Sequence, residues 1–545
     1  MDYKKNRKSK KRNMNPDKIA FINGKIYTVN RKQPLSKAVV AGGNKILYTG
    51  NNSGAKKFID NKTEIIDLSG RFMLPGFIDG HTHFINGGFY MTGLDLRQAA
   101  STNEFKKFLK EYIELHRSKW ITGGSWDHQA WEIKELPVKE MIDPFTGDTP
   151  VFIERIDKHM ALANSLALKL AGITKDTVCP TGGEIVKNPV TDEPTGILKD
   201  NAMPLIYSII PGQSEKEIDE AALMALGEAK KNGITSIHDI TYINDLLAYQ
   251  RLEKEGKLSC RVYTRLPIAD YKNLTGEGIQ FYNKSSKIKT GSLKAFSDGS
   301  LGAGTAWFFD NYPGEQTSGL AAETVLDGRL KTWALEADKN KFQLSIHAIG
   351  DKANNYVLDL FENIIKINPV WDRRFRIEHA QHIRKSDIKR FADMNVIASV
   401  QPYHLIDDGT WAEKKLGSER IKEAYPYKSL IDAGVTLCFG SDWTVAPLNP
   451  ILGIYAAVTR STLDGKNPDG WIPEQKIGVE DAIKGYTINN AFAAFEEDII
   501  GSIEAGKFAD FVVLDSDILE IAPDKIKDVK VDMTVSDGKI IYQRY

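Results

Sequence analysis

The sequence predicts an α/β fold: a (β/α)8 barrel of the TIM type, a small β-sandwich domain, and a domain inserted after barrel strand 1. Eight short apolar segments alternate with amphipathic helical stretches along most of the 545 residues, and eight such units make this kind of barrel. Strand-like segments with Asn-Gly and Asp-Gly turns lie at both ends of the chain. Roughly 150 residues separate the first barrel segment from the second, which is too many for one crossover connection.

The two ends of the chain are expected to build the small β domain together. Residues 18–30 and 37–49 read as short strands around turns, and residues 509–515 and 531–543 have the same pattern. We therefore assign residues 17–71 and 500–545 to this domain. Residues 1–16 are rich in lysine and arginine, and no apolar segment follows them. They predict a disordered basic tail rather than a secretory signal.

The barrel strands are predicted from short apolar runs that end in polar residues. Helical periodicity falls between them, as in residues 215–232, 351–367 and 419–433. The barrel is assigned to residues 72–85 and 211–499, and residues 86–210 to an inserted domain that contributes to the substrate pocket. The predicted strands are residues 72–83, 235–240, 261–266, 292–298, 343–349, 375–381, 397–403 and 436–442.

Composition narrows the class of function. Lysine and arginine number 72, as do aspartate and glutamate, so nothing favours nucleic acid or an anionic membrane as a partner. Three cysteines cannot form a disulfide framework in a chain of this length. No apolar run reaches the length of about 18 residues that a membrane helix needs. We expect a cytoplasmic protein that binds a small molecule. The composition is also compatible with assembly into a homo-oligomer.

Metal-ligating residue types gather at the ends of the predicted strands. His81 and His83 end the first strand, and side chains at i and i+2 point to one face, so both imidazoles can reach one ion. His347 ends the fifth strand, His379 the sixth and Asp442 the eighth. Barrel enzymes keep their catalytic groups at this end. Each residue alone is more readily a hydrogen-bonded polar group, but together they indicate a site for zinc or a similar divalent ion.

Several segments resemble the signature segments of the amidohydrolase superfamily, namely PGFIDGHTHF, SIHAIGD, RIEHAQ and FGSDWTVAPLNP. GSIEAGKFADFVVLD resembles the return of these enzymes into their small β domain. With WITGGSWDHQAW, RIDKHMALANSLAL and LKAFSDGSLG added, the sequence is similar to the amidohydrolase 3 family, which includes N-substituted formamide deformylase. The resemblance covers the chain from residue 18 onward.

The resemblance implies a metal site whose ligands are the residues of this sequence that match the family's ligand positions. It also implies that Lys294, in the fourth strand, is carboxylated by CO2 and bridges two divalent ions, expected to be zinc. An unmodified lysine is a cation and cannot be a ligand, whereas a carbamate is an anionic one. The alternative is that Lys294 pairs with a carboxylate such as Asp298. The other implied ligands are His81, His83, His347, His379 and Asp442.

The expected reaction is hydrolysis of a carbon–nitrogen bond, other than a peptide bond, in a small amide-like substrate. A divalent ion lowers the pKa of bound water to about 7, which supplies hydroxide at neutral pH. Asp442 then acts as general base and general acid. Deamination, or ester or lactone cleavage, could use the same metal centre, and a non-catalytic regulatory protein on this scaffold is a third alternative.

Substrate contacts are expected from the insert and from the second barrel strand. For His238, the alternative to substrate contact is a supporting role behind the metal ligands. The insert carries Asp157-Lys158-His159 where the family usually has Asp-Gly-His, and Thr444-Val445 stands where Pro-Val is usual. Both departures make the substrate hard to assign by analogy. The residues expected to contact substrate are Trp126, Asp127, Arg155, His159 and His238.

Overall fold

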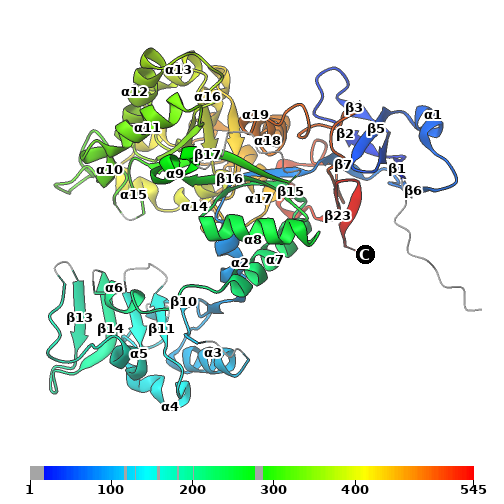
Figure 1. The fold of residues 1–545 in the computed structure, drawn as a ribbon. Coiled ribbons are helices and arrows are strands. Elements are labelled where there is room, and N and C mark those ends of the chain that lie inside the picture. Colours follow the sequence, from blue (N-terminus) through cyan, green and yellow to red (C-terminus); the bar gives the residue numbers. More distant parts are fainter. Residues whose placement is uncertain are drawn as a thin grey trace, which may run out of the picture. The chain divides into compact units, whose positions relative to one another are not determined.

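The computed structural model describes two compact units, one with the barrel and the small β domain and one with residues 85–225 (Figure 1). The predicted basic tail, residues 1–16, lies outside the described residues. Among the described residues, no helix is both long and apolar enough to cross a bilayer. The structure describes residues 18–115, 119–128, 131–155, 160–180, 183–200, 202–276, 287–302 and 304–544.

The first unit contains a parallel eight-stranded sheet, and this confirms the predicted (β/α)8 barrel. The sheet runs from β8 to β21 in chain order, and a bridge between Thr82 and Trp443 links its two edges. The backbone N–H of Asp442 donates to the carbonyl of His81 at 2.7 Å across the same seam. The strands are β8 (Phe77–Thr82), β15 (Ile234–Ile240), β16 (Arg261–Pro267), β17 (Ile288–Phe296), β18 (Leu344–Ala348), β19 (Arg376–His379), β20 (Ile397–Val400) and β21 (Leu437–Phe439).

Helices follow the barrel strands, and the prediction of a helix over residues 351–367 is confirmed. The predicted helix over residues 419–433 is wrong as one element. Proline has no N–H to donate and ends a helix, so Pro426 separates the 3-10 turn η5 (Arg420–Glu423) from α16 (Tyr427–Asp432). The principal helices, among them the confirmed α12, are α7 (Glu215–Lys231), α8 (Ile243–Lys254), α11 (Arg329–Lys339), α12 (Asp351–Ile367), α13 (Lys385–Asp393), α14 (Pro402–Asp408) and α17 (Pro450–Thr459).

The first predicted barrel strand, residues 72–83, is two strands in two sheets. β7 (Phe72–Pro75) pairs with β2 (Lys25–Tyr27) and β22 (Phe511–Leu514) in the small domain, and only β8 belongs to the barrel. The chain changes sheet at Gly76, whose N–H donates to Asp510 at 2.9 Å. A Cβ there would lie 2.3 Å from the Thr235 hydroxyl oxygen, so the close approach requires glycine.

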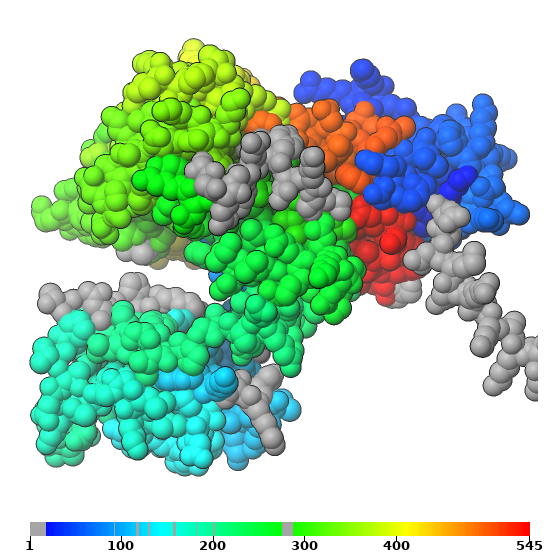
Figure 2. Space-filling view, viewed as in Figure 1, coloured from blue at the N-terminus to red at the C-terminus, as the bar shows by residue number. Residues whose placement is uncertain are grey.

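The small domain is a sandwich of a four-stranded and a six-stranded sheet, as predicted. Strands from the two ends of the chain are neighbours in the six-stranded sheet, and blue and red segments lie together in Figure 2. Buried side chains of both sheets, such as Phe21 and Phe511, form its core. The first sheet contains β1 (Lys18–Ile22), β4 (Ala38–Gly42), β5 (Lys45–Gly50) and β6 (Thr63–Asp67). The second contains β2 (Lys25–Tyr27), β3 (Leu35–Ser36), β7, β22 (Phe511–Leu514), β23 (Val531–Ser536) and β24 (Lys539–Gln543).

The second unit contains a six-stranded mixed sheet with its own buried core. Helices α3 (Thr102–Leu115) and α5 (Ser165–Leu170) belong to it. Its sheet order is β13 (Gly183–Lys187), β14 (Pro194–Asp200), β12 (Met160–Ala163), β11 (Phe152–Arg155), β10 (Gly123–Trp126) and β9 (Leu94–Asp95).

Candidate metal centre

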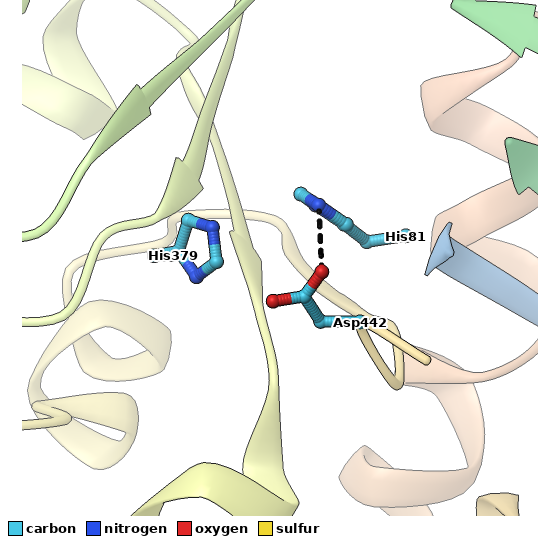
Figure 3. Close-up of side chains that lie close together, drawn as sticks. All are labelled: His81, His379 and Asp442. Atoms are coloured by element: carbon cyan, nitrogen blue, oxygen red, sulfur yellow. Dashed lines mark ion pairs between the residues drawn. The ribbon is translucent and has the colours of Figure 1, made fainter. Parts of the chain in front are cut away.

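Three predicted ligands meet at the carboxyl end of the barrel strands. His81 lies in β8, His379 ends β19, and Asp442 follows β21. One ligand atom from each lies within 4.8 Å of the other two, and all three side chains are buried (Figure 3). His81 Nε2 is 3.5 Å from Asp442 Oδ1. The fold therefore brings together residues that lie up to 361 positions apart in the sequence (442 − 81).

The other predicted ligands lie around this group. His83 Nε2 is 3.4 Å from the same Asp442 oxygen. The ring centroid of His347 is 4.4 Å from that of His379. Lys294 projects from β17, is 3% exposed, and has its ammonium 4.5 Å from the Phe296 ring centroid. Burial lowers the pKa of Lys294 to about 7.

The backbone at the site is held in uncommon conformations. His379 and Asp442 have φ of 70° and 56°, a region that residues other than glycine seldom occupy. Gly440 packs so closely on the first strand that a Cβ there would lie 2.3 Å from the His81 backbone nitrogen. The Asp79 carboxylate accepts the N–H groups of both His81 and Ser441, at 3.1 and 2.9 Å, and so joins the two segments. Strained backbone of this kind concentrates at functional sites.

Burial favours the neutral form of His81, His347 and His379, which is the form that binds metal. It lowers the pKa of His81 and of His347 to about 3, and it holds the pKa of His379 well below its usual range. Burial alone would raise the pKa of Asp442, but the nearby histidines, His83 first, hold it well below its ordinary value. At neutral pH the site therefore presents imidazole lone pairs and a carboxylate.

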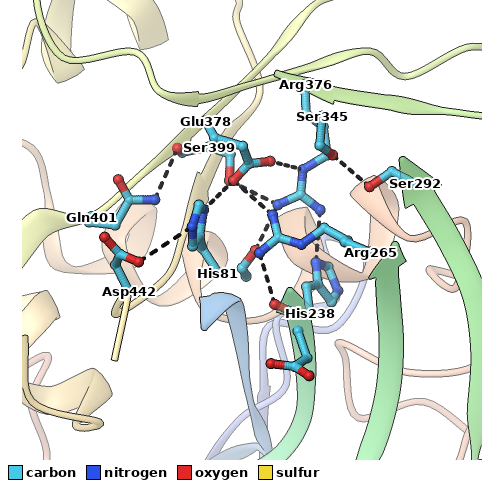
Figure 4. A network of polar contacts seen from close by, with 12 residues as sticks. His81, His238, Arg265, Ser292, Ser345, Arg376, Glu378, Ser399, Gln401 and Asp442 are labelled. Atoms are coloured by element: carbon cyan, nitrogen blue, oxygen red, sulfur yellow. Dashed lines mark hydrogen bonds and ion pairs between the residues drawn. The ribbon is translucent and has the colours of Figure 1, made fainter. Parts of the chain in front are cut away.

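A buried ionic network lies directly behind His81 (Figure 4). The Glu378 carboxylate accepts a hydrogen bond from His81 Nδ1. It also forms ion pairs with Arg265 and Arg376, at 2.9 and 3.0 Å. Although burial favours the neutral acid, Arg376 and Arg265 hold the pKa of Glu378 well below its usual value. The sequence analysis missed these three residues, although charged side chains at i and i+2 in a buried strand, Arg376 and Glu378, were a signal for them.

His404 is a further residue that the sequence did not reveal. It lies in α14, just after the seventh strand, and its Nε2 is 3.9 Å from Asp442 Oδ2. Its ring stacks on His379 at a centroid distance of 6.2 Å. Its Nε2 is buried and has no hydrogen-bond partner among the described residues. The available signal was its place at the same end of the barrel as the other histidines.

Comparison with known proteins agrees with this fold and site. The model of the amidohydrolase family matches residues 64–542. The chain belongs to the amidohydrolase family. It is 37% identical to the protein LONG AFTER FAR-RED 3 of Arabidopsis thaliana, over 96% of this chain and 91% of that protein. It is 26% identical to N-substituted formamide deformylase of Arthrobacter pascens, over 96% of this chain and 98% of that enzyme.

A solved structure extends the likeness to the whole fold of this amidohydrolase. The structure is that of an uncharacterized metal-dependent hydrolase of Pyrococcus horikoshii, with a TM-score of 0.80 and 29% sequence identity. It covers 93% of this chain and 99% of the Pyrococcus chain. The family, the fold and the donor set agree on a hydrolase with a site for a divalent metal.

The donor atoms of this amidohydrolase fit a divalent cation. A carboxylate can only accept, so the hydrogen bond to Glu378 places the proton of neutral His81 on Nδ1 and its lone pair on Nε2. That lone pair faces the Asp442 carboxylate at 3.5 Å, an arrangement that a cation between the two atoms stabilises. Within the part of the chain that the structure describes, the buried atoms Lys294 Nζ and His379 Nδ1 have no hydrogen-bond partners. Nitrogen and oxygen donors without thiolate suit zinc and similar ions.

The residues predicted to contact substrate have different environments. Trp126 is 0% exposed, and its indole N–H donates to the Ile153 carbonyl at 2.9 Å, so its position in the core of the insert favours packing over substrate contact. His238 is fully buried, with Nδ1 2.9 Å from Arg376, which favours its alternative role behind the ligands. Asp127 and Arg155 form a partly exposed ion pair at 2.7 Å. His159 lies outside the described residues.

Proposed function

We propose that this protein is a metal-dependent amidohydrolase that cleaves a non-peptide carbon–nitrogen bond in a small amide-like substrate. The convergence of His81, His379 and Asp442 at the barrel mouth is the observation that carries the proposal. His83 and His347 would complete the histidine set. When bound, a divalent ion acidifies water and polarises a carbonyl oxygen.

Asp442 is assigned the proton transfers. Its low pKa makes it a carboxylate at neutral pH, so it can accept the proton of the attacking water as the new C–O bond forms. It would then deliver that proton to the leaving nitrogen as the C–N bond breaks. His404, near the other Asp442 oxygen, is placed to offer a hydrogen bond to the substrate.

Lys294 is proposed to carry a carbamate that bridges two ions. Its neutral amine would attack CO2, forming a C–N bond and releasing one proton to solvent. Among the described residues, no carboxylate forms an ion pair with Lys294. Asp298, the alternative partner, instead accepts the backbone N–H groups of Trp307, Ile349 and Gly350. An anionic bridge would offset the repulsion between two close cations.

The insert is proposed to supply part of the substrate pocket. The Asp127–Arg155 pair is a charged and partly exposed element of the insert. Guanidinium and carboxylate groups are chemically suited to binding polar substrate groups. His159 stays a proposed contact on sequence grounds alone.

A substrate panel tests the proposed bond class. N-substituted formamides come first, because a relative with 26% identity carries that activity in its name. Other N-acyl amines, hydantoins, lactones and amino-heterocycles should be measured beside them with protein of known metal content. Turnover of lactones or amino-heterocycles alone would replace the amide proposal with the esterase or deaminase alternative. Stoichiometric metal with no turnover across the panel would favour the regulatory alternative.

A further inference from the structure

The layer of side chains beneath the metal ligands is ionic, whereas TIM-barrel interiors are usually filled by branched apolar residues. Arg265, Arg376 and Glu378 are each 0% exposed. Burying an ion carries a large desolvation cost, and a buried ion pair often contributes no more stability than apolar residues of the same volume. A contribution to folding stability therefore does not explain why three charges are buried here. Their contacts indicate their role instead.

Every member of this layer is held from more than one side. Arg376 donates to the Gly80 carbonyl at 2.7 Å and to the Ser399 hydroxyl at 2.8 Å. Ser399 in turn donates to Glu378 Oε2 at 2.8 Å. Arg265 donates to the backbone carbonyl of His238 at 3.0 Å. The Glu378 carboxylate is thus fixed between β16, β19 and β20, and the remaining contact of Oε2 is His81.

We infer that Glu378, clamped by Arg265 and Arg376, is a positioning residue that sets the tautomer and ring orientation of His81. The two guanidiniums hold Glu378 in place through ion pairs at 2.9 and 3.0 Å. The carboxylate holds the His81 proton on Nδ1 and aims Nε2 at the ligand group. Such partners of metal-binding histidines typically change metal affinity or activity 10- to 100-fold when they are mutated. The inference rests on the proposed metal centre.

The test measures zinc affinity rather than turnover. Apo protein is titrated with zinc against a chromophoric chelator, for the wild type and for Glu378→Gln. Glutamine keeps the shape but loses the charge, and its amide oxygen no longer has to face the imidazole. We expect the zinc dissociation constant to rise about 10- to 100-fold. The stabilisation of the variant by excess zinc should shrink in parallel, because ligand-linked stabilisation follows the dissociation constant.

Asp338→Asn is the matched control. Asp338 is also a buried carboxylate paired with an arginine, Arg373, at 2.8 Å, but this pair lies before the start of β19, at the end opposite the ligands. The Asp338→Asn substitution should lower the melting temperature of the apo protein and leave its zinc affinity unchanged. A loss of affinity in both variants would mean that Glu378 acts only through general stability.

If Glu378→Gln fails to fold, Ser399→Ala tests the inference in its place. It removes one hydrogen bond to Glu378 and keeps every charge, so a rise of several-fold in the zinc dissociation constant is expected. A folded Glu378→Gln protein, or failing that a folded Ser399→Ala protein, with wild-type zinc affinity overturns the inference. A wild-type protein that binds no zinc, manganese or iron would instead overturn the proposed function, so the two failures are distinguishable.

Discussion

Replacing Asp442 with asparagine separates the charge of this side chain from its shape. The carboxylate lies 3.4 Å from His83 Nε2, 3.5 Å from His81 Nε2 and 3.9 Å from His404 Nε2. The backbone there has φ of 56°, which asparagine adopts more readily than alanine does. Asp442→Asn therefore keeps the backbone and the volume but removes the base.

The expected loss follows from the role assigned to Asp442. General acid–base catalysis contributes about 10²- to 10⁴-fold to a rate, which corresponds to roughly 2.7–5.4 kcal/mol in the activation free energy. The assay is kcat on the best panel substrate, expressed per metal-loaded molecule, with metal content measured by elemental analysis. Asp338→Asn is the control and should keep the wild-type kcat. An Asp442→Asn protein that retains its metal and turns over at the wild-type rate would show that the base is misassigned.

The remaining predictions concern the metal, the bridge and the insert. Gently purified protein should carry at least one divalent ion per chain and lose both activity and thermal stability to chelators; the absence of stoichiometric metal would contradict the site. Lys294→Ala should lose metal and activity together, with partial rescue by short carboxylic acids, whereas Lys294→Arg should not be rescued; full metal content in either variant would rule out the bridge. Trp126→Ala should destabilise the insert by about 3–5 kcal/mol in chemical denaturation, because a fully buried indole is removed, and an effect under about 1 kcal/mol would contradict a core role. Arg155→Ala should raise KM about 10-fold, as for loss of a charge-assisted hydrogen bond, with metal content unchanged; an unchanged KM would remove this pair from the pocket.

Prediction from sequence was strongest where the pattern is local. The barrel segments were located to within a few residues because apolar runs, turn residues and helical periodicity are short-range signals. One error arose where tertiary contacts decide. Residues 72–83 look like one strand, but Gly76 passes the chain from one sheet to another through contacts with Asp510 and Thr235. The other error was local, because Pro426 interrupts a helix that the apolar periodicity alone would continue, and this proline is visible in the sequence.

The fold class and the family follow from the sequence, as do the imidazole and carboxylate side chains at the strand ends, because these depend on residue identity and spacing. The tertiary fold brings together the side chains that share a site. It placed Trp126 in a core, His238 beneath the ligands, and Glu378 and His404 beside them. The burial of Trp126 depends on packing within the insert. The positions of His238, Glu378 and His404 depend on barrel closure, which brings side chains from distant strands within hydrogen-bonding distance. Spacing along the chain carries no record of such contacts.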